Sequence, residues 1–127
     1  MEGKRNVSFT LLEKEFIHTM RSGINNSEDK ADLEKNFANV MKLFMKRVFE
    51  INKLSIDIDD NDFMFNPKAR NYFTVSGRLR QMQDFKNLWE GTEIASVIAR
   101  FADSTHKKYL HLDRQREKAR FKIRNVV

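Results

Sequence analysis

The sequence has no cysteine, a single proline and only four glycines among 127 residues. Without cysteine the chain has no disulfide, no thiolate metal site and no cysteine nucleophile, which fits a reducing compartment. The scarcity of glycine and proline argues against β-sandwiches and barrels, because those folds need frequent turns. Many long side chains with few turn-forming residues favour a mostly helical fold.

Long apolar runs are also missing. No stretch approaches the roughly 20 apolar residues of a membrane span, and residues 1–16 contain no apolar run of signal-peptide length. Hydrophobic residues make up 40% of the chain and charged residues 33%, a balance typical of a folded protein. We therefore expect a cytoplasmic protein without a membrane partner, folded as a single helical domain over residues 1–127.

Charge is unevenly distributed along the chain, whose formal net charge is +6. Residues 1–65 carry a net charge of −2, and residues 66–105 carry +2. Residues 106–127 contain eight Lys or Arg and two acidic residues, a net charge of +6. Segregated charge of one sign bears on what a protein binds more than on how it folds, so the basic end of the chain is the first place to look for a partner.

Two long helices are predicted, over about 28–54 and about 93–124. Ser27 is the expected cap of the first of them. Each carries an apolar stripe at helical spacing. In the first the stripe is Phe37, Met41, Phe44, Val48 and Ile51, widened by Leu33 and Val40; in the second it is Ile94, Ile98, Phe101, Thr105, Tyr109, Leu112, Ala119, Ile123 and Val126.

Two shorter helices complete an all-α fold, an antiparallel helical bundle. Thr10 and Glu13 have the spacing of a capping box for the first helix, which Gly23 ends. The other shorter helix ends at Gly91, with apolar positions at Leu79, Met82, Phe85 and Leu88 or Trp89.

Residues 55–77 lack the helical apolar spacing of the neighbouring segments, and a small β element within them is compatible with their sequence. Ile56–Asp59 alternates apolar and acidic residues, which suits a short strand. Asn66 and Pro67 suit the start of a short helix. Ser76 and Gly77 can form the turn of a hairpin, or Ser76 can follow a helix end and cap the next helix. We favour the second alternative, because the apolar spacing after Ser76 is helical.

No local motif indicates an enzyme. The four glycines are too far apart for a phosphate-binding loop. His106 and His111 are five residues apart and do not share a helix face as a ligand pair would. Asp103 is three residues from His106, but such a pair is more often a surface contact than part of a catalytic unit. We expect neither catalytic residues nor a cofactor nor a metal.

Two further patterns have an ordinary structural explanation. Asp57, Asp59 and Asn61 have the opening spacing of an EF-hand loop, yet the positions that require Gly and Glu hold Asp62 and Lys68. In the segment from Lys68 to Arg80, basic residues flank Tyr72 and Phe73, a combination that can stack bases; core packing of the two aromatic side chains is the favoured explanation.

The last helix is two-faced. On a helical wheel six basic side chains fall within about 100° of each other, away from the apolar stripe. They are Arg100, Lys107, His111, Arg114, Lys118 and Lys122. From the first to the last the row is about 33 Å long, at about 1.5 Å per residue, and a row of that length can neutralise several phosphates.

Two functions follow from this helix. The first is a small nucleic-acid-binding accessory or regulatory protein that uses the six residues on phosphates. The alternative is a protein-interaction module (an adaptor, inhibitor or assembly subunit) whose basic helix grips an acidic partner or the chain's own Asp57–Asp62 segment. Because the long apolar stripe needs a cover, we also expect self-association through residues 93–126.

The EF-hand-like spacing yields a first prediction. Titration with Ca²⁺ should produce no specific binding heat, because a lysine at position 68 cannot supply the bidentate carboxylate that closes such a loop. Isothermal calorimetry checks this, and a micromolar dissociation constant would contradict it.

Overall fold

The structure is a computed structural model that describes the backbone of residues 9–126 and the side chains of residues 9–116. Its elements, in chain order, are α1 (Thr10–Asn25), α2 (Lys30–Ile51), β1 (Phe63–Phe65), the 3-10 turn η2 (Arg70–Tyr72), β2 (Phe73–Val75), α3 (Gly77–Arg80), α4 (Gln83–Gly91) and α5 (Ile94–Val126). The predicted helical bundle with a small β element is confirmed.

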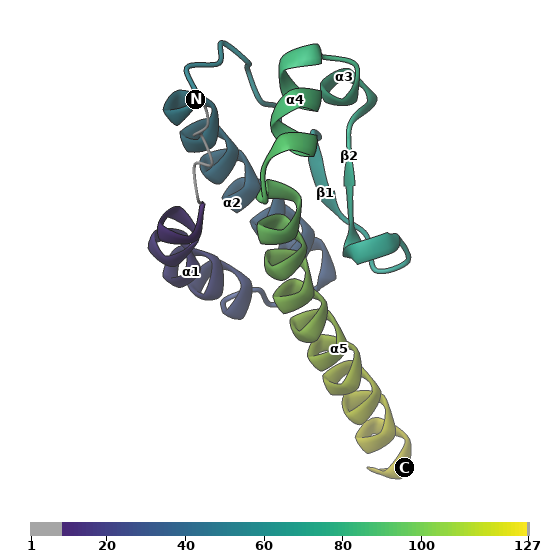
Figure 1. Cartoon of the computed structure of the whole chain (residues 1–127). Coiled ribbons are helices and arrows are strands. Elements are labelled where there is room, and N and C mark those ends of the chain that lie inside the picture. Colours follow the sequence, from purple (N-terminus) through teal and green to yellow (C-terminus); the bar gives the residue numbers. More distant parts are fainter. Residues whose placement is uncertain (1–8, 127) are drawn as a thin grey trace.

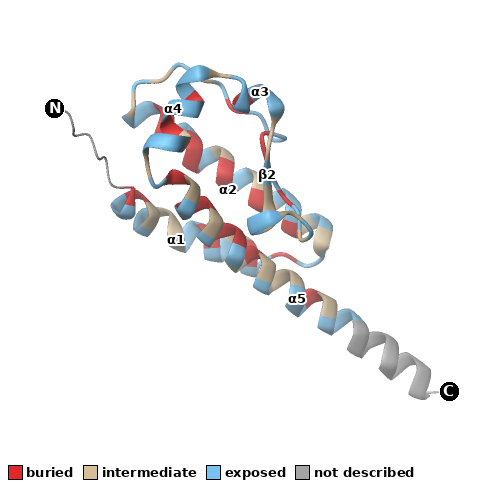
Figure 2. Ribbon diagram, turned by 45° about the vertical axis from the view of Figure 1, so that its right-hand side comes forward, coloured by how far each residue is buried: buried red, intermediate tan, exposed pale blue. Residues whose placement is uncertain are grey.

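Helices α1, α2 and α5 pack against one another, and α2 and α5 run in opposite directions (Figure 1). The β1–β2 hairpin lies against α2 through β1, and η2 lies against α5. The short helices α3 and α4 cover the end of the bundle where α5 begins (Figure 1). Beyond this body α5 continues as a projecting helix, and among its residues with described side chains the buried ones lie between Ile94 and Leu112 (Figure 2).

An aromatic cluster joins the three packed helices. The ring of Phe44 on α2 lies edge-on to Phe16 of α1 at 5.4 Å and to Phe101 of α5 at 5.2 Å, between ring centroids. On the same helix Phe37 meets Phe65 of β1 at 6.0 Å, which brings the hairpin into the same core. Edge-to-face pairs of this kind add roughly 0.5–1.5 kcal/mol each beyond the area they bury.

The predicted stripe of α2 is buried from Leu33 to Val48, but its last member is not. Ile51 is 40% exposed, and Phe49 is buried in its place. The helix ends at Ile51, three residues before the predicted end. Lys53 adopts a left-handed conformation, and the amides of Lys53 and Leu54 bond to the carbonyls of Glu50 and Phe49, a Schellman motif that closes α2.

Helix starts differ from those predicted. Asp29, not Ser27, caps α2, and its carboxylate accepts from the Asp32 amide at 2.8 Å. Ser27 is buried in the α1–α2 connection, where its hydroxyl donates to the Gly23 carbonyl. At α1 the capping box is wrong, because Phe9 is the cap residue and makes no side-chain bond there. Its amide donates to the Glu93 carboxylate at 2.8 Å instead.

The β element lies within the predicted interval but uses other residues. Ile56–Asp59 has no strand partner, so the predicted strand there is wrong. The strands β1 and β2 pair antiparallel, with Phe63 opposite Val75 and Phe65 opposite Phe73. Asn66 begins the turn between them rather than a helix, and its side chain accepts from the Lys68 amide at 2.9 Å.

Ser76 caps α3, as the favoured alternative required, and accepts from the Leu79 amide at 3.3 Å. The segment before it, however, is the strand β2 and not a helix end. The helix expected from Leu79 to Gly91 is interrupted at Met82, whose backbone is extended. The interruption lets both Leu79 and Phe85 reach the core, at 0% and 2% exposure.

The stripe of α5 is confirmed as far as side chains are described. Ile94, Ile98, Phe101, Thr105 and Leu112 are buried, while Tyr109 is half-buried against the core. Thr105 donates its hydroxyl to the Phe101 carbonyl at 2.9 Å, so its burial leaves no unsatisfied donor. The predicted positions Ala119, Ile123 and Val126 lie outside the residues whose side chains are described.

Packing at Phe44 yields a second prediction. Phe44→Ala should lower the free energy of unfolding by about 3–5 kcal/mol, because the ring is fully buried between two others. Leu43→Ala, one residue earlier and 54% exposed, should change it by less than about 0.5 kcal/mol. Urea unfolding followed by circular dichroism measures both. Equal midpoints for the two variants would refute the role given to Phe44.

Candidate functional site

The first residue of the predicted cationic row is engaged within the fold. Arg100 donates two hydrogen bonds of 2.7 Å from its Nε and Nη2 to the carboxylate of Glu13 on α1. These bonds raise the pKa of Arg100. A bidentate pair of this kind fixes the geometry of both side chains, so Arg100 ties α1 to α5 and is less available to an external anion.

The next member, Lys107, has a nearby acid on its own helix. Its ammonium lies 3.4 Å from the carboxylate of Asp103, one turn earlier. Both side chains are more than half exposed, and pairs of this kind contribute only about 0.3–0.5 kcal/mol. A phosphate can therefore displace Asp103 at little cost, and Lys107 keeps most of its value as a ligand for an anion.

His111 and Arg114 are exposed. Among the residues with described side chains, no acidic group forms an ion pair with either of them. The last two members of the row, Lys118 and Lys122, lie outside the residues whose side chains are described. Among the row's members with described side chains, Lys107, His111 and Arg114 therefore remain available to an external anion. Lys107 and His111 lie on turns of α5 that are still anchored to the bundle, and Arg114 directly follows the Lys30–Asp113 contact.

An aromatic stack fixes the root of the projecting part of α5. The imidazole of His106 lies parallel to the ring of Tyr72 in η2, with centroids 3.8 Å apart and planes 2° apart. One turn along α5, the ammonium of Lys30 lies 4.6 Å above the ring centroid of Tyr109 and 2.7 Å from the carboxylate of Asp113. The hydrogen bond to Asp113 raises the pKa of Lys30.

Sequence reasoning missed this stack. The sequence suggests for His106 only a pair with His111 or a contact with Asp103, and it suggests no partner for Lys30. The stack anchors α5 to both the hairpin and the start of α2, so the cations beyond it project from a fixed base. The signal available in the sequence was the pair Tyr72 and Phe73, for which core packing was favoured over base stacking.

The acidic segment 57–62 is anchored by Asp62, which is 3% exposed. Its carboxylate accepts from the Asp59 amide at 2.7 Å, from the Ser76 hydroxyl at 2.6 Å, and from the guanidinium of Arg78. Arg78 also donates to the Asp57 carbonyl at 2.8 Å. The cations that contact this segment among the described residues thus come from α3 (Arg78) and α2 (Lys42), whereas the alternative above had considered the basic last helix.

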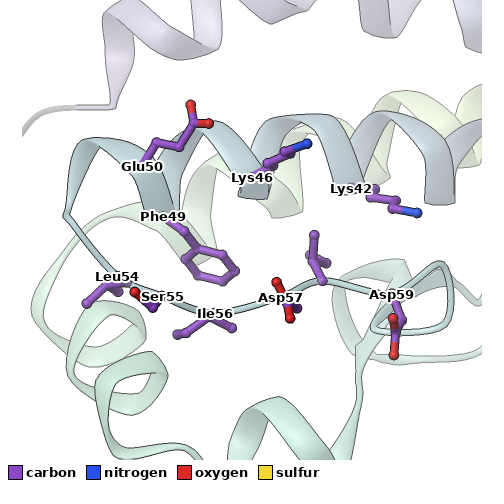
Figure 3. Close-up of a pocket in the computed structure, with 10 residues that line it drawn as sticks. Lys42, Lys46, Phe49, Glu50, Leu54, Ser55, Ile56, Asp57 and Asp59 are labelled. Carbon is purple, nitrogen blue, oxygen red and sulfur yellow. The ribbon is translucent and has the colours of Figure 1, made fainter.

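A hollow of about 720 Å³ separates part of this segment from α2 (Figure 3). Lys42 and Lys46 of α2 line one side, and Asp57 and Asp59 line the other. Lys42 is engaged with Asp60 at 3.1 Å. Across the described residues, no group of three or more His, Asp or Glu side chains is placed to hold a metal ion. With charges of both signs on its walls, this hollow indicates no particular ligand.

Comparison with protein-family models, with curated proteins and with solved structures found no match for this chain. Within the part of the chain that the structure describes, no helix has both the length and the apolar character needed to cross a membrane.

The environment of Asp62 yields a third prediction. Burial alone raises the pKa of this carboxyl, but the hydrogen bonds from Asp59, Ser76 and Arg78 outweigh burial and hold the pKa below its ordinary value. A carboxyl whose pKa is lower in the folded state stabilises the fold at pH values above its unfolded pKa of about 3.9. This stabilisation is lost as the pH falls through the pKa of the folded state.

Asp62→Asn should therefore lower the free energy of unfolding by about 1–2 kcal/mol at pH 7, because half-exposed Arg78 keeps part of its hydration. The difference from the parent should shrink below about pH 4, as the parent carboxyl becomes protonated. Urea unfolding at a series of pH values measures it. A difference that is constant with pH would show that the charge of Asp62 does not stabilise the fold.

Proposed function

We propose that this protein binds nucleic acid through the projecting half of α5, mainly by contacts with phosphates. One observation carries the proposal: α5 continues as a helix to Val126, past the packed body, through the segment that holds eight basic and two acidic residues. A projecting basic helix can approach a polyanion without interference from the body that carries it.

Electrostatics supports a phosphate ligand. The net charge of residues 106–127 equals that of the whole chain, +6. In the described part of this helix Lys107, His111 and Arg114 are exposed at successive turns, and Lys118 and Lys122 continue the same spacing in the sequence. From Lys107 to Lys122 the row is about 23 Å long, at about 1.5 Å per residue.

The dimensions of a single α-helix also fit the major groove of DNA. The major groove of DNA is about 12 Å wide and admits a single α-helix. Contacts with phosphates position a protein without reading sequence, and base readout needs side chains that reach base edges. The described cations are suited to the first task, so the proposed binding is strong at low salt and weakly selective for sequence.

The alternative, a protein-interaction module, has one observation in its favour. Leu110, between the cations of the projecting helix, is 40% exposed. An exposed leucine beside basic residues suits an acidic protein partner with an apolar groove, and also the self-association predicted from the sequence. Salt separates the two functions. The logarithm of the affinity for nucleic acid falls linearly with the logarithm of the salt concentration, whereas a helix-in-groove protein interface should lose less affinity.

The fourth prediction tests the row directly. The triple variant Arg114→Glu, Lys118→Glu, Lys122→Glu should lose at least about tenfold in affinity for duplex DNA or RNA, and its salt slope should fall by roughly three. Fluorescence anisotropy with labelled duplexes over a salt series measures both quantities. Arg114 is exposed, and substitutions of exposed side chains usually change stability by about 0.5 kcal/mol or less. Circular dichroism of the triple variant verifies that it is folded.

A matched control reverses three exposed cations of α1 and α2: Lys14→Glu, Arg21→Glu, Lys35→Glu. It changes the net charge by the same amount on another face, and should bind nearly as the parent does. If the two triple variants lose affinity equally, net charge and not the row determines binding. If the parent binds neither DNA nor RNA at physiological salt, the nucleic-acid proposal fails and the protein-interaction function takes its place.

A further inference from the structure

We propose that the outer edge of β2 and a hollow beside it bind an extended, acidic peptide segment of a protein partner, which adds a third strand to the hairpin. This surface lies on β2, α3 and α4, away from the projecting half of α5 (Figure 1), and the proposal is independent of nucleic-acid binding. It rests on three features: the direction of the backbone groups of β2, the shape beside them and the local charge.

The hydrogen-bond pattern of the hairpin leaves one edge of β2 unused. The Asn66 amide donates to the Tyr72 carbonyl, and the Ser76 amide donates to the Asp62 carbonyl. Bonded and non-bonded residue pairs alternate along an antiparallel ladder, so the opposed pair Phe63 and Val75 is of the non-bonded kind, as is Phe65 with Phe73.

The amides and carbonyls of Phe73 and Val75 therefore point away from β1. No backbone hydrogen bond outside the hairpin uses them among the described residues. An edge of this kind is a template for an additional strand.

Next to this edge is a hollow of about 320 Å³. Its walls are Val75 of β2, Arg80 of α3, and Phe85, Lys86, Trp89 and Glu90 of α4. Trp89 is half-buried and held by Phe85, at 5.4 Å between ring centroids, and by Phe73, at 6.1 Å. The tryptophan and phenylalanine rings thus form a fixed apolar wall, which can receive one apolar side chain of a strand paired with β2.

Charge favours an acidic occupant, since four exposed cations lie around β2 and Glu90 is the single acidic residue among the described residues that line the hollow. Residues 66–90 contain five basic and two acidic residues. Arg78 is engaged with Asp62, but Lys68 and Arg70 before β2, and Arg80 and Lys86 after it, are exposed. None of these four forms an ion pair with another described residue. A strand along β2 would therefore have cations beside both of its ends.

The same charges argue against a second copy of this chain as the occupant. Two β2 strands related by a two-fold axis would pair antiparallel, which would place Lys68 and Arg70 of one copy beside Arg80 and Lys86 of the other. Like charges directly opposite one another destabilise a strand pair. Carboxylates at both ends of a peptide would instead meet cations at each end.

Trp89 provides the measurement, because it is the only tryptophan of the chain. The probe is a peptide of sequence Asp-Glu-Val-Ile-Val-Glu-Asp with blocked ends. Titrating it into the full chain should change the Trp89 emission saturably. A peptide with Lys in place of each Asp and Glu is the charge control, and should bind at least about tenfold more weakly.

Main-chain pairing has its own test on the peptide. In one version of the peptide the second, fourth and sixth residues (Glu, Ile and Glu) are N-methylated. In another version the third, fifth and seventh residues (Val, Val and Asp) are N-methylated. Only one of these alternating sets faces β2 in a given register, so one methylated peptide should lose binding while the other keeps it. Val75→Pro gives the complementary test on the protein, because it removes an outward amide and no bond of the hairpin. Its expected effect is a loss of about fivefold or more in affinity.

The double variant Arg80→Glu, Lys86→Glu should weaken peptide binding about tenfold. Its matched control, Lys14→Glu with Lys35→Glu, should bind the peptide as the parent does, and both variants should retain duplex binding if α5 is the nucleic-acid site. Circular dichroism verifies that each variant is folded. The proposal is overturned if the acidic and lysine peptides bind equally, if both methylated peptides bind as the unmodified one does, or if a DNA duplex displaces the peptide competitively.

Discussion

The arrangement of the three long helices depends on the contacts of the Phe44 ring. The ring is fully buried, and it meets Phe16 of α1 on one side and Phe101 of α5 on the other. A chain without cysteine has no covalent cross-link to hold three helices together, so the free energy must come from burying apolar surface. Large flat rings supply that surface with few rotatable bonds, and they also define one geometry of packing.

Once α5 is packed against Phe44, three further contacts along its length attach it to the rest of the fold. Arg100 joins it to Glu13, His106 stacks on Tyr72, and Asp113 receives Lys30. Beyond these contacts the described side chains are mostly exposed (Figure 2). The basic end of the chain is thus attached to a rigid base, and both proposed surfaces depend on that base: one extends from it, and the other lies on the hairpin that η2 fixes to it.

Helical spacing was sufficient to predict most of the core, because the three longest helices, α1, α2 and α5, repeat their apolar period several times. It failed where the period is short or the partner is remote. A strand of three residues, such as Phe63–Phe65, shows no repeat, and Ile56–Asp59 alternates like a strand but has no partner. The helical-wheel projection placed Arg100 on an exposed cationic face of α5. No local sequence feature reveals that Glu13, 87 positions earlier, lies beside it.

The bond from the Phe9 amide to Glu93 has a consequence for the order of folding. Together with the Glu13–Arg100 pair, it closes a loop of more than eighty residues, and the entropy of such a closure must be lost before the contact is made. The hairpin and the α3–α4 turn close much shorter loops. Contacts between neighbouring segments form faster than remote ones, so the α1–α2 pair and the hairpin are expected to form before α5 docks on them. Until α5 docks, the face of Phe44 that Phe101 covers stays exposed to water.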